Sequence, residues 1–516
     1  MKPIKLITGF LTVGVWTLLS RVLGFVRDIM IASSLGAGPV AEAFLVAFSL
    51  PNMFRRFFAE GAFNMAFIPI FSKKLENDED ARTFANDAFT GLATVLIAFS
   101  TLAIALMPWL VFAMASGFVG DERFELSVAY GRVAFPYILF ISLAALLSGV
   151  LNSTGRFVAA AAAPVVLNVM FVGALILAET LGWAPGDTLV WTVPLAGIAQ
   201  LVLVWVAAAR AGFRLRFRMP RLTPDLKRLA RIAGPAMLAG GVVQINLLIG
   251  RQVGSFFDGA IAWLSYADRL YQLPLGVVGI AVGVVLLPEL SRRLAAGDET
   301  GGREAFNRAC EFSLAMTVPA AIALIAIPMP LVSVLFGRGA FEQSDVVATA
   351  IAVAIYGAGL PAFVLQKTLQ PLYFAREDTR SPFRFAVWSM VVNAAVAIGL
   401  APFIGFAAAA LGTTLAGWSM VWQLWSGVRG MGAAASVDDR FRRRGWRILA
   451  AALSMGVVLW VAAQLLSGAL ETPTLRYIAL MGLVALGIVS YFGIGHLIGA
   501  FRLSEFSRAM KRSNAT

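Results

Sequence analysis

Long apolar stretches recur along almost the whole chain, from Ile4 to Phe501, and short polar segments separate them. An apolar stretch of about 20 residues spans a bilayer as an α-helix. The pattern predicts fourteen membrane-spanning helices, at 6–33, 41–71, 87–115, 127–151, 157–180, 188–210, 228–256, 259–290, 309–336, 346–373, 383–402, 404–428, 446–467 and 475–501. The predicted fold class is therefore an all-α, polytopic membrane protein.

The first apolar stretch resembles a signal peptide only at its start. No small-residue cleavage pattern follows it, and the helical pattern continues through Arg21 and Arg27 to Ala32. We therefore expect this stretch to be the first span of the mature protein.

Composition and charge support a membrane location. Of 516 residues, 59% are hydrophobic and only 14% are charged, whereas about 25% are charged in soluble domains. The formal charge of +13 would suggest nucleic-acid binding in a soluble protein, but here the basic residues lie mostly between spans. If both termini are cytoplasmic, the cytoplasmic segments and borders hold 31 Lys and Arg residues against 4 on the other side. This contrast predicts cytoplasmic termini and no nucleic-acid partner.

Two sequence echoes indicate an internal duplication. The segment 69–75 (PIFSKKL) resembles 288–294 (PELSRRL), 219 residues further on, and Asn168 and Asn393 are 225 residues apart in spans that each follow a short basic turn. Spans 1–6 and 7–12 are therefore predicted to form two parallel lobes around a central cavity. The predicted divisions are an N-lobe at 1–211, a basic cytoplasmic linker at 212–227, a C-lobe at 228–430, and spans 13 and 14 with the C-terminal tail at 431–516.

Charged residues also lie inside the predicted spans. A charge at the bilayer centre costs about 2.5–3.5 kcal/mol on insertion scales, so such residues normally face protein or water. The basic ones are Arg21, Arg27, Arg55, Arg56, Arg251, Arg269 and Lys367. Arg251 and Lys367 lie near span ends and could extend to the membrane surface instead.

The polar residues of spans 1 and 2 fall on helix faces. Ser20, Arg21, Arg27 and Asp28 belong to one helix, and the last three share about a third of its circumference with Gly24. Either arginine could pair with Asp28 and tie helices together, or the face could line a cavity. In span 2, polar residues recur every four positions and suggest a stripe that lines a path or packs on another polar helix. They are Asn52, Arg56, Glu60 and Asn64, with Arg55 beside them.

Span 8 repeats this arrangement with Ser265, Asp268, Arg269, Gln272 and Gly276. Across these spans the arginines outnumber the acids, so a cavity lined by them would be cationic. The planar guanidinium binds phosphate oxygens through two parallel hydrogen bonds and stays charged at physiological pH. These residues therefore favour an anionic ligand such as a pyrophosphate.

The combination of these motifs resembles the MurJ (MviN) family of lipid II flippases, within the multidrug/oligosaccharidyl-lipid/polysaccharide exporter superfamily. The resemblance covers essentially the whole chain and rests on five short segments. They are 20–28 (SRVLGFVRD), 43–52 with Arg55 and Arg56, 59–63 (AEGAF), 266–269 (YADR) and 287–288 (LP).

The resemblance implies a flippase that moves the undecaprenyl-pyrophosphate-linked disaccharide-pentapeptide, lipid II, across the bacterial inner membrane by alternating access. It implies that spans 13 and 14 accommodate the polyprenyl tail, with membrane lipids and other cell-wall synthesis proteins as further partners. The expected substrate-binding residues are Arg21, Arg27, Asp28, Arg55, Arg56, Glu60, Asp268 and Arg269, followed by Ser20, Glu42, Asn52, Gln272 and Lys367.

Two positions depart from the family pattern. Glu42 stands where Asp is common, which keeps the charge on a longer arm. Some members bind sodium through carboxylates in spans 7 and 11, whereas this chain has Asn246 and Asn393 there. This difference argues against a sodium-driven mechanism.

Other functions lack the residues they need. Cys310 and His496 are single, and the acidic segment 78–80 lies beside basic residues in a loop without a second carboxylate motif. We therefore expect no metal site, no cofactor and no catalytic site. The alternatives to a flippase are a drug or cation antiporter of the same superfamily, which needs an acidic cavity, and a membrane enzyme acting on polyprenyl-linked sugars.

Overall fold

The computed structural model of the chain describes residues 6–56, 58, 62–77 and 79–501. All regular elements in these ranges are helices, so the predicted all-α class is confirmed. Each predicted span contains one long helix or two consecutive helices. In the same ranges, nine helical segments are long and apolar enough to cross a membrane by length and composition.

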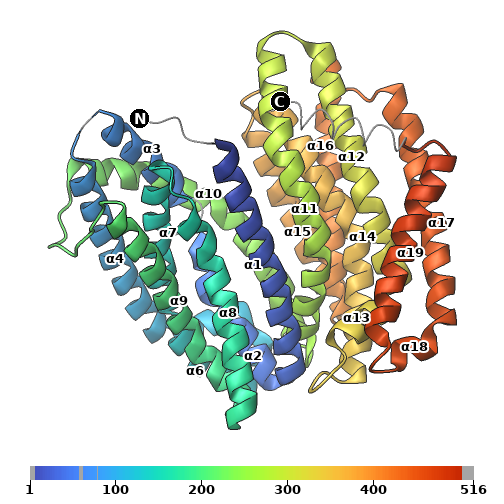
Figure 1. Cartoon of the computed structure of the whole chain (residues 1–516), viewed down its shortest axis with the longest axis horizontal. Helices are drawn as coiled ribbons and strands as arrows, with labels where there is room; N and C mark the ends of the chain where they lie inside the picture. The colour runs from blue at the N-terminus through green and yellow to red at the C-terminus, as the bar shows by residue number, and fades with distance from the viewer. Residues whose placement is uncertain (1–5, 57, 59–61, 78, 502–516) are drawn as a thin grey trace. The chain divides into compact units, whose positions relative to one another are not determined.

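The chain forms two compact units (Figure 1). The first contains residues 1–262 and 339–341, and the second contains 263–338 and 342–516. This division differs from the predicted lobes because helix α10 belongs to the first unit. A division into compact units does not test whether the chain contains two copies of one unit. The predicted duplication and its boundaries therefore stay predictions.

The first unit is a bundle of membrane-length and shorter helices. They are α1 (Leu6–Leu35), α2 (Pro39–Arg55), α3 (Ala62–Glu76), α4 (Ala81–Ala105), α5 (Met107–Met114), α6 (Glu122–Ala134), α7 (Tyr137–Ser153), α8 (Val158–Leu181), α9 (Pro185–Arg210) and α10 (Pro224–Gly254), with a short 3-10 turn, η2 (Ser116–Phe118). Helix α7 packs on α9, and α1 packs on α8.

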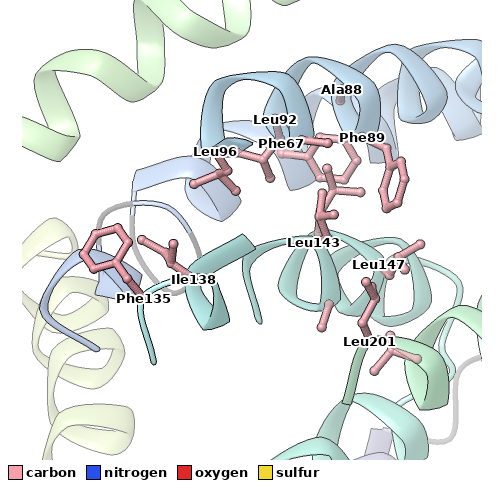
Figure 2. Packing of buried hydrophobic residues seen from close by; sticks show 14 of the residues in the cluster. Phe67, Ala88, Phe89, Leu92, Leu96, Phe135, Ile138, Leu143, Leu147 and Leu201 are labelled. Atoms are coloured by element: carbon pink, nitrogen blue, oxygen red, sulfur yellow. The ribbon is translucent and has the colours of Figure 1, made fainter. Parts of the chain in front are cut away.

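The core of the first unit is apolar and aromatic (Figure 2). Phe67 of α3 and Phe89 of α4 lie above Leu143 and Leu147 of α7 in this view, and Leu201 of α9 closes the cluster. In a membrane, close van der Waals packing of such side chains favours helix association. The core therefore holds α3, α4, α7 and α9 together as one body.

The second unit begins within α11 (Ala260–Ala295). Its other helices are α12 (Glu299–Ala326), α13 (Pro328–Phe336), α14 (Gln343–Phe374), α15 (Arg380–Ile404), α16 (Ala407–Val428), α17 (Asp439–Leu465), α18 (Ser467–Glu471) and α19 (Arg476–Leu497), with a short turn, η3 (Ala433–Ala435). Helices α17 and α19 correspond to predicted spans 13 and 14. They share a core with α12, where the Tyr491 hydroxyl donates to the Ala315 carbonyl at 2.7 Å.

Several helices start at side-chain caps that the sequence provides. Asp80 accepts the backbone N–H of Thr83 before α4, and Thr223 accepts that of Leu226 before α10. These caps satisfy backbone donors that have no partner inside the helix. Gly182, with a φ of 69°, ends α8 in the left-handed conformation that glycine adopts readily.

The segment between α9 and α10 is extended and lies along α4. The backbone N–H of Arg216 donates to Asn86 Oδ1 at 2.7 Å, and that of Arg218 donates to Thr90 Oγ1 at 3.2 Å. The Phe217 ring contacts the Phe89 ring, with centroids 5.1 Å apart. The predicted linker is therefore fixed to the first unit by specific contacts.

One short segment joins the first unit from far along the sequence. The backbone N–H of Ala340 donates to the Ser33 carbonyl at 2.8 Å, beyond the middle of α1. Gly36 and Gly339 have φ angles of 61° and 60°. A Cβ atom on Gly36 would lie 2.3 Å from the Ala340 carbonyl oxygen, so this close approach requires glycine.

Candidate functional site

Arg27 and Asp28 form a buried ion pair on α1, with exposed fractions of 8% each. Arg27 Nε and Nη2 donate to Asp28 Oδ1 at 2.9 and 2.7 Å. Arg27 Nη1 donates to Asn168 Oδ1 on α8 at 3.0 Å. The pair expected as an alternative from the sequence is therefore present, and it also ties α1 to α8.

Asn168 completes this cluster by donating back to α1. Its Nδ2 lies 2.8 Å from the Ser20 carbonyl and 3.3 Å from Ser20 Oγ. Gly24 faces the same amide, where a Cβ atom would meet Asn168 Nδ2 at 3.5 Å. The Arg27 guanidinium also lies over the Phe171 ring of α8, 5.7 Å from its centroid. The predicted polar face of span 1 therefore packs against α8.

Arg21 lies on the same face and is half-buried. Within the described ranges it forms no hydrogen bond or ion pair, in contrast to Arg27. Its charge is therefore the one on this face that no carboxylate of the described chain neutralises.

The described residues of span 2 depart from regular α-helical geometry after Arg55. Helix α2 ends at Arg55, Arg56 and Phe58 have π-helical geometry, and α3 begins at Ala62. A π-turn inserts an extra residue into the helix and rotates everything that follows. Because Glu60 lies outside the described residues, the predicted stripe from Asn52 to Asn64 stays a prediction.

The predicted site residues of span 2 have different surroundings. Arg55 is half-buried and Arg56 is exposed. The Asn52 amide donates to the Phe48 carbonyl of its own helix at 2.8 Å. Glu60 lies outside the described residues. These positions remain predicted substrate contacts.

Glu42 lies in a buried charge network at the start of α2. Its carboxylate, 1% exposed, accepts Arg123 Nη1 at 2.9 Å and the Ile261 backbone N–H at 3.0 Å. Arg123 also pairs with Asp121 at 2.6 Å and with Asp258 at 2.8 Å. The backbone N–H of Arg123 lowers the pKa of Asp121, so this loop carboxylate stays ionised.

The sequence did not single out Arg123 or Asn168 as site residues. In the sequence, Arg123 was noted only as one of the four basic residues on the predicted periplasmic side. Asn168 was noted only as part of the predicted duplication. Their partners lie 81 and 141 residues away along the chain, so no local pattern could reveal them.

The predicted site residues of the second unit lie on α11 and α14. Asp268 is half-buried and accepts the Gln272 side-chain amide, one turn further along α11. Arg269 and Lys367 are exposed. The hydrogen bond from Gln272 fixes the Asp268 carboxylate. Arg269 follows Asp268 directly in the sequence, which favours a shared role of these two residues.

Taken unit by unit, the first brings together Ser20, Arg27 and Asp28, and separately engages Glu42 with Arg123. The second brings Asp268 and Gln272 together. In the described ranges, no group of three or more His, Cys, Asp or Glu side chains could hold a metal ion.

Comparison with known proteins gives one consistent result. The family model described as lipid II flippase MurJ matches residues 31–484. A protein of Rhizobium meliloti named probable lipid II flippase MurJ is 44% identical over 98% of this chain and 97% of its own length. The lipid II flippase MurJ of Burkholderia cenocepacia is 34% identical over 98% of this chain and all of its own.

A solved structure shares the fold. It is described as lipid II flippase MurJ in an inward closed conformation, and it matches with a TM-score of 0.78 at 23% identity. The match covers 94% of this chain and 98% of that one.

Proposed function

This chain belongs to the lipid II flippase MurJ family, and on that premise we propose that it moves lipid II from the cytoplasmic to the periplasmic leaflet of the bacterial inner membrane. Members of this family are membrane transporters rather than enzymes. The observation that supports the proposal best is Arg27, a buried arginine inside an apolar helix that keeps unused donors.

The donor count of Arg27 explains how it can bind both protein and substrate. A guanidinium has five N–H donors. Three hydrogen bonds fix Arg27 to Asp28 and Asn168, so two N–H groups are left for a phosphate oxygen. Asp28 holds the side chain in position, and the substrate supplies the remaining acceptors.

The other arginines supply the charge that a pyrophosphate needs. We propose that Arg21, Arg55, Arg56 and Arg269, the set expected from the sequence, supply this charge, with Asp28, Glu60 and Asp268 orienting them. Ser20, Asn52 and Gln272 add neutral polar groups. Glu42 and Lys367 complete this set, and Glu42 contributes by holding Arg123.

Transport requires the substrate to meet first one membrane surface and then the other. Two parallel lobes of six spans would achieve this by rocking around the bound pyrophosphate. Both termini would lie in the cytoplasm, as the 31 to 4 distribution of Lys and Arg favours. Helices α17 and α19, which lie outside the predicted duplication, would accommodate the polyprenyl tail.

The test is flipping of fluorescent lipid II in proteoliposomes that contain the purified chain, under imposed ion gradients. The wild type should flip it. Arg21→Ala and Arg269→Ala should each reduce the rate at least about tenfold, since one charge-assisted hydrogen bond contributes about 1.5–3 kcal/mol.

Arg132→Ala is the matched control, because Arg132 is an exposed arginine of α6 outside the predicted site. Wild-type rates in both Arg21→Ala and Arg269→Ala would refute the arginine site. Absence of lipid II flipping by the wild type under every gradient would refute the proposed function.

A further inference from the structure

A polar cleft lies in the second unit, away from all the residues discussed above. It has a volume of about 520 Å³ and lies among the start of α13, the end of α17, α18 and the start of α19. Its polar lining includes Ser333, Gln464, Ser467, Glu471 and Arg476, and Trp460 forms part of its wall. Figure 1 shows α13, α18 and α19 at the same end of this unit.

Arg476 lines this cleft, and Arg338 shares its hydrogen-bond partner Tyr477; neither arginine has a carboxylate partner in the described part of the chain. Arg338 Nη1 and Arg476 Nη2 both donate to the Tyr477 hydroxyl, each at 3.1 Å. Their other hydrogen bonds go to the carbonyls of Leu335 and Gly337. Neither arginine forms an ion pair within the described ranges. Two positive charges therefore share one neutral oxygen, and an anion beside them would relieve their repulsion.

The hydrogen-bonding capacity of these arginines is also incomplete. The Nε atoms of Arg338 and Arg476 are buried and have no hydrogen-bond partner. A buried donor without an acceptor is costly. Phosphate oxygens satisfy an arginine through Nε and Nη together, so a small shift of Arg476 toward the cleft would allow this geometry.

The cleft also contains an acid that is not used internally. Glu471 at the end of α18 is exposed and forms no ion pair with Arg476 or with any other described residue. Trp460, with an exposed fraction of 56%, lies on the facing helix α17. A carboxylate and an aromatic ring are the groups that bind an ammonium. The cleft thus offers separate places for a phosphate and for a cation.

The surroundings of the cleft are those of a lipid-facing surface. Leu465 beside it is 80% exposed, and Ile478 on the first turn of α19 is 62% exposed. Met329 and Leu470 supply an apolar wall. A headgroup in the cleft would therefore have its acyl chains next to apolar side chains.

We propose that this cleft binds the headgroup of an aminophospholipid, with the phosphate at Arg476 and Arg338 and the primary ammonium at Glu471. In the proposed orientation the lipid belongs to the periplasmic leaflet. This site does not depend on the flippase proposal, because its geometry uses none of the predicted substrate contacts.

The experiment is native mass spectrometry of the full chain in mild detergent, titrated with phosphatidylethanolamine. The wild type should bind one lipid at a saturable site. Arg476→Gln and Arg338→Gln should each weaken this binding about tenfold, the effect of losing one charge-assisted hydrogen bond. The matched control Arg132→Gln makes the same substitution at an exposed arginine of the first unit and should bind like the wild type.

Glu471→Gln separates the two halves of the headgroup. It should weaken binding of phosphatidylethanolamine and leave binding of phosphatidylglycerol, which has no ammonium, unchanged. Arg476→Gln should weaken both. Unchanged phosphatidylethanolamine binding in Glu471→Gln would show that the ammonium assignment is wrong, and Glu471 is exposed enough to be replaced without disturbing the fold.

Inorganic phosphate distinguishes a lipid site from a site for small anions. Millimolar phosphate should not displace the lipid, and displacement would overturn the lipid proposal. Equal lipid binding by the wild type and both arginine variants would overturn the site itself. Thermal unfolding of each variant identifies any that is misfolded. If an arginine variant is misfolded, lipid binding by Glu471→Gln decides whether the cleft binds the headgroup.

Discussion

The side-chain amide of Asn168 links α8 to α1. Its amide accepts from Arg27 and donates to the Ser20 carbonyl, so both of its ends are used. In a membrane, where lipid offers no competing hydrogen bonds, an interhelical contact of this kind fixes which faces meet. Replacing the oxygen or the nitrogen of this amide would change the position of the Arg27 guanidinium.

We expect Asn168→Ala to destabilise the protein by about 0.6–1.7 kcal/mol, from the average to the maximum value for interhelical hydrogen bonds in membranes. The apparent Tm in detergent should fall by a few degrees. Thr180→Ala on the same helix is the control, since Thr180 bonds only to Leu177 of its own helix. Equal Tm values for Asn168→Ala and the control would show that the amide does not link the helices.

The Glu42 and Arg123 pair predicts a strong energetic coupling. Removing one partner of a buried ion pair costs about 3–5 kcal/mol because the other charge stays buried. Arg123→Gln should therefore be strongly destabilising, and adding Glu42→Gln should restore part of the loss. A double-mutant cycle on unfolding in detergent measures this. Additive effects of the two substitutions would instead favour independent roles, with Glu42 acting mainly on substrate.

At the scale of elements, the helices were predictable from the sequence because a bilayer demands long apolar stretches. Each predicted span coincides with a helix or a helix pair. The π-helical geometry at Arg56 and Phe58 was not predictable, because a π-turn needs only one extra residue and leaves the apolar pattern intact. The same limit applies to the candidate site: the polar faces of spans 1 and 8 were visible, but Arg123 and Asn168 act through distant partners.

The extended segment along α4 gives a prediction about this element. Asn86 and Thr90 each accept one of its backbone N–H groups. Replacing both with alanine removes two hydrogen bonds of about 1 kcal/mol each, so the population of the released state should rise about thirtyfold. Trypsin should then cleave after Arg216 and Arg218 correspondingly faster.

Limited proteolysis with mass spectrometry measures these cleavage rates. Thr94→Ala, in the next turn of α4, is the control because Thr94 bonds only to its own helix. Unchanged cleavage in the Asn86→Ala, Thr90→Ala double variant would mean that the Phe217 contact alone holds the segment.

For the molecule as a whole, the proposed orientation makes a prediction about accessibility. Gly212 follows α9, on the predicted cytoplasmic side, and Ser467 begins α18, on the predicted periplasmic side. In a Cys310→Ser background, Ser467→Cys should react with an impermeant maleimide on intact spheroplasts. Gly212→Cys should react only after permeabilisation. The reverse pattern would place the termini in the periplasm and invalidate the orientation drawn from the basic residues.

The contact between Ala340 and Ser33 has a consequence for biosynthesis. The first unit is incomplete until residues 339–341 exist, although the rest of it ends at residue 262. At a synthesis rate of ~5–20 residues per second, the ribosome needs roughly 4–16 s more to reach these residues. During that interval the end of α1 is inserted but lacks its late neighbour. A truncated chain that stops before residue 339 therefore cannot form the complete first unit, so expressing it as a separate fragment would require that short segment to be supplied in trans.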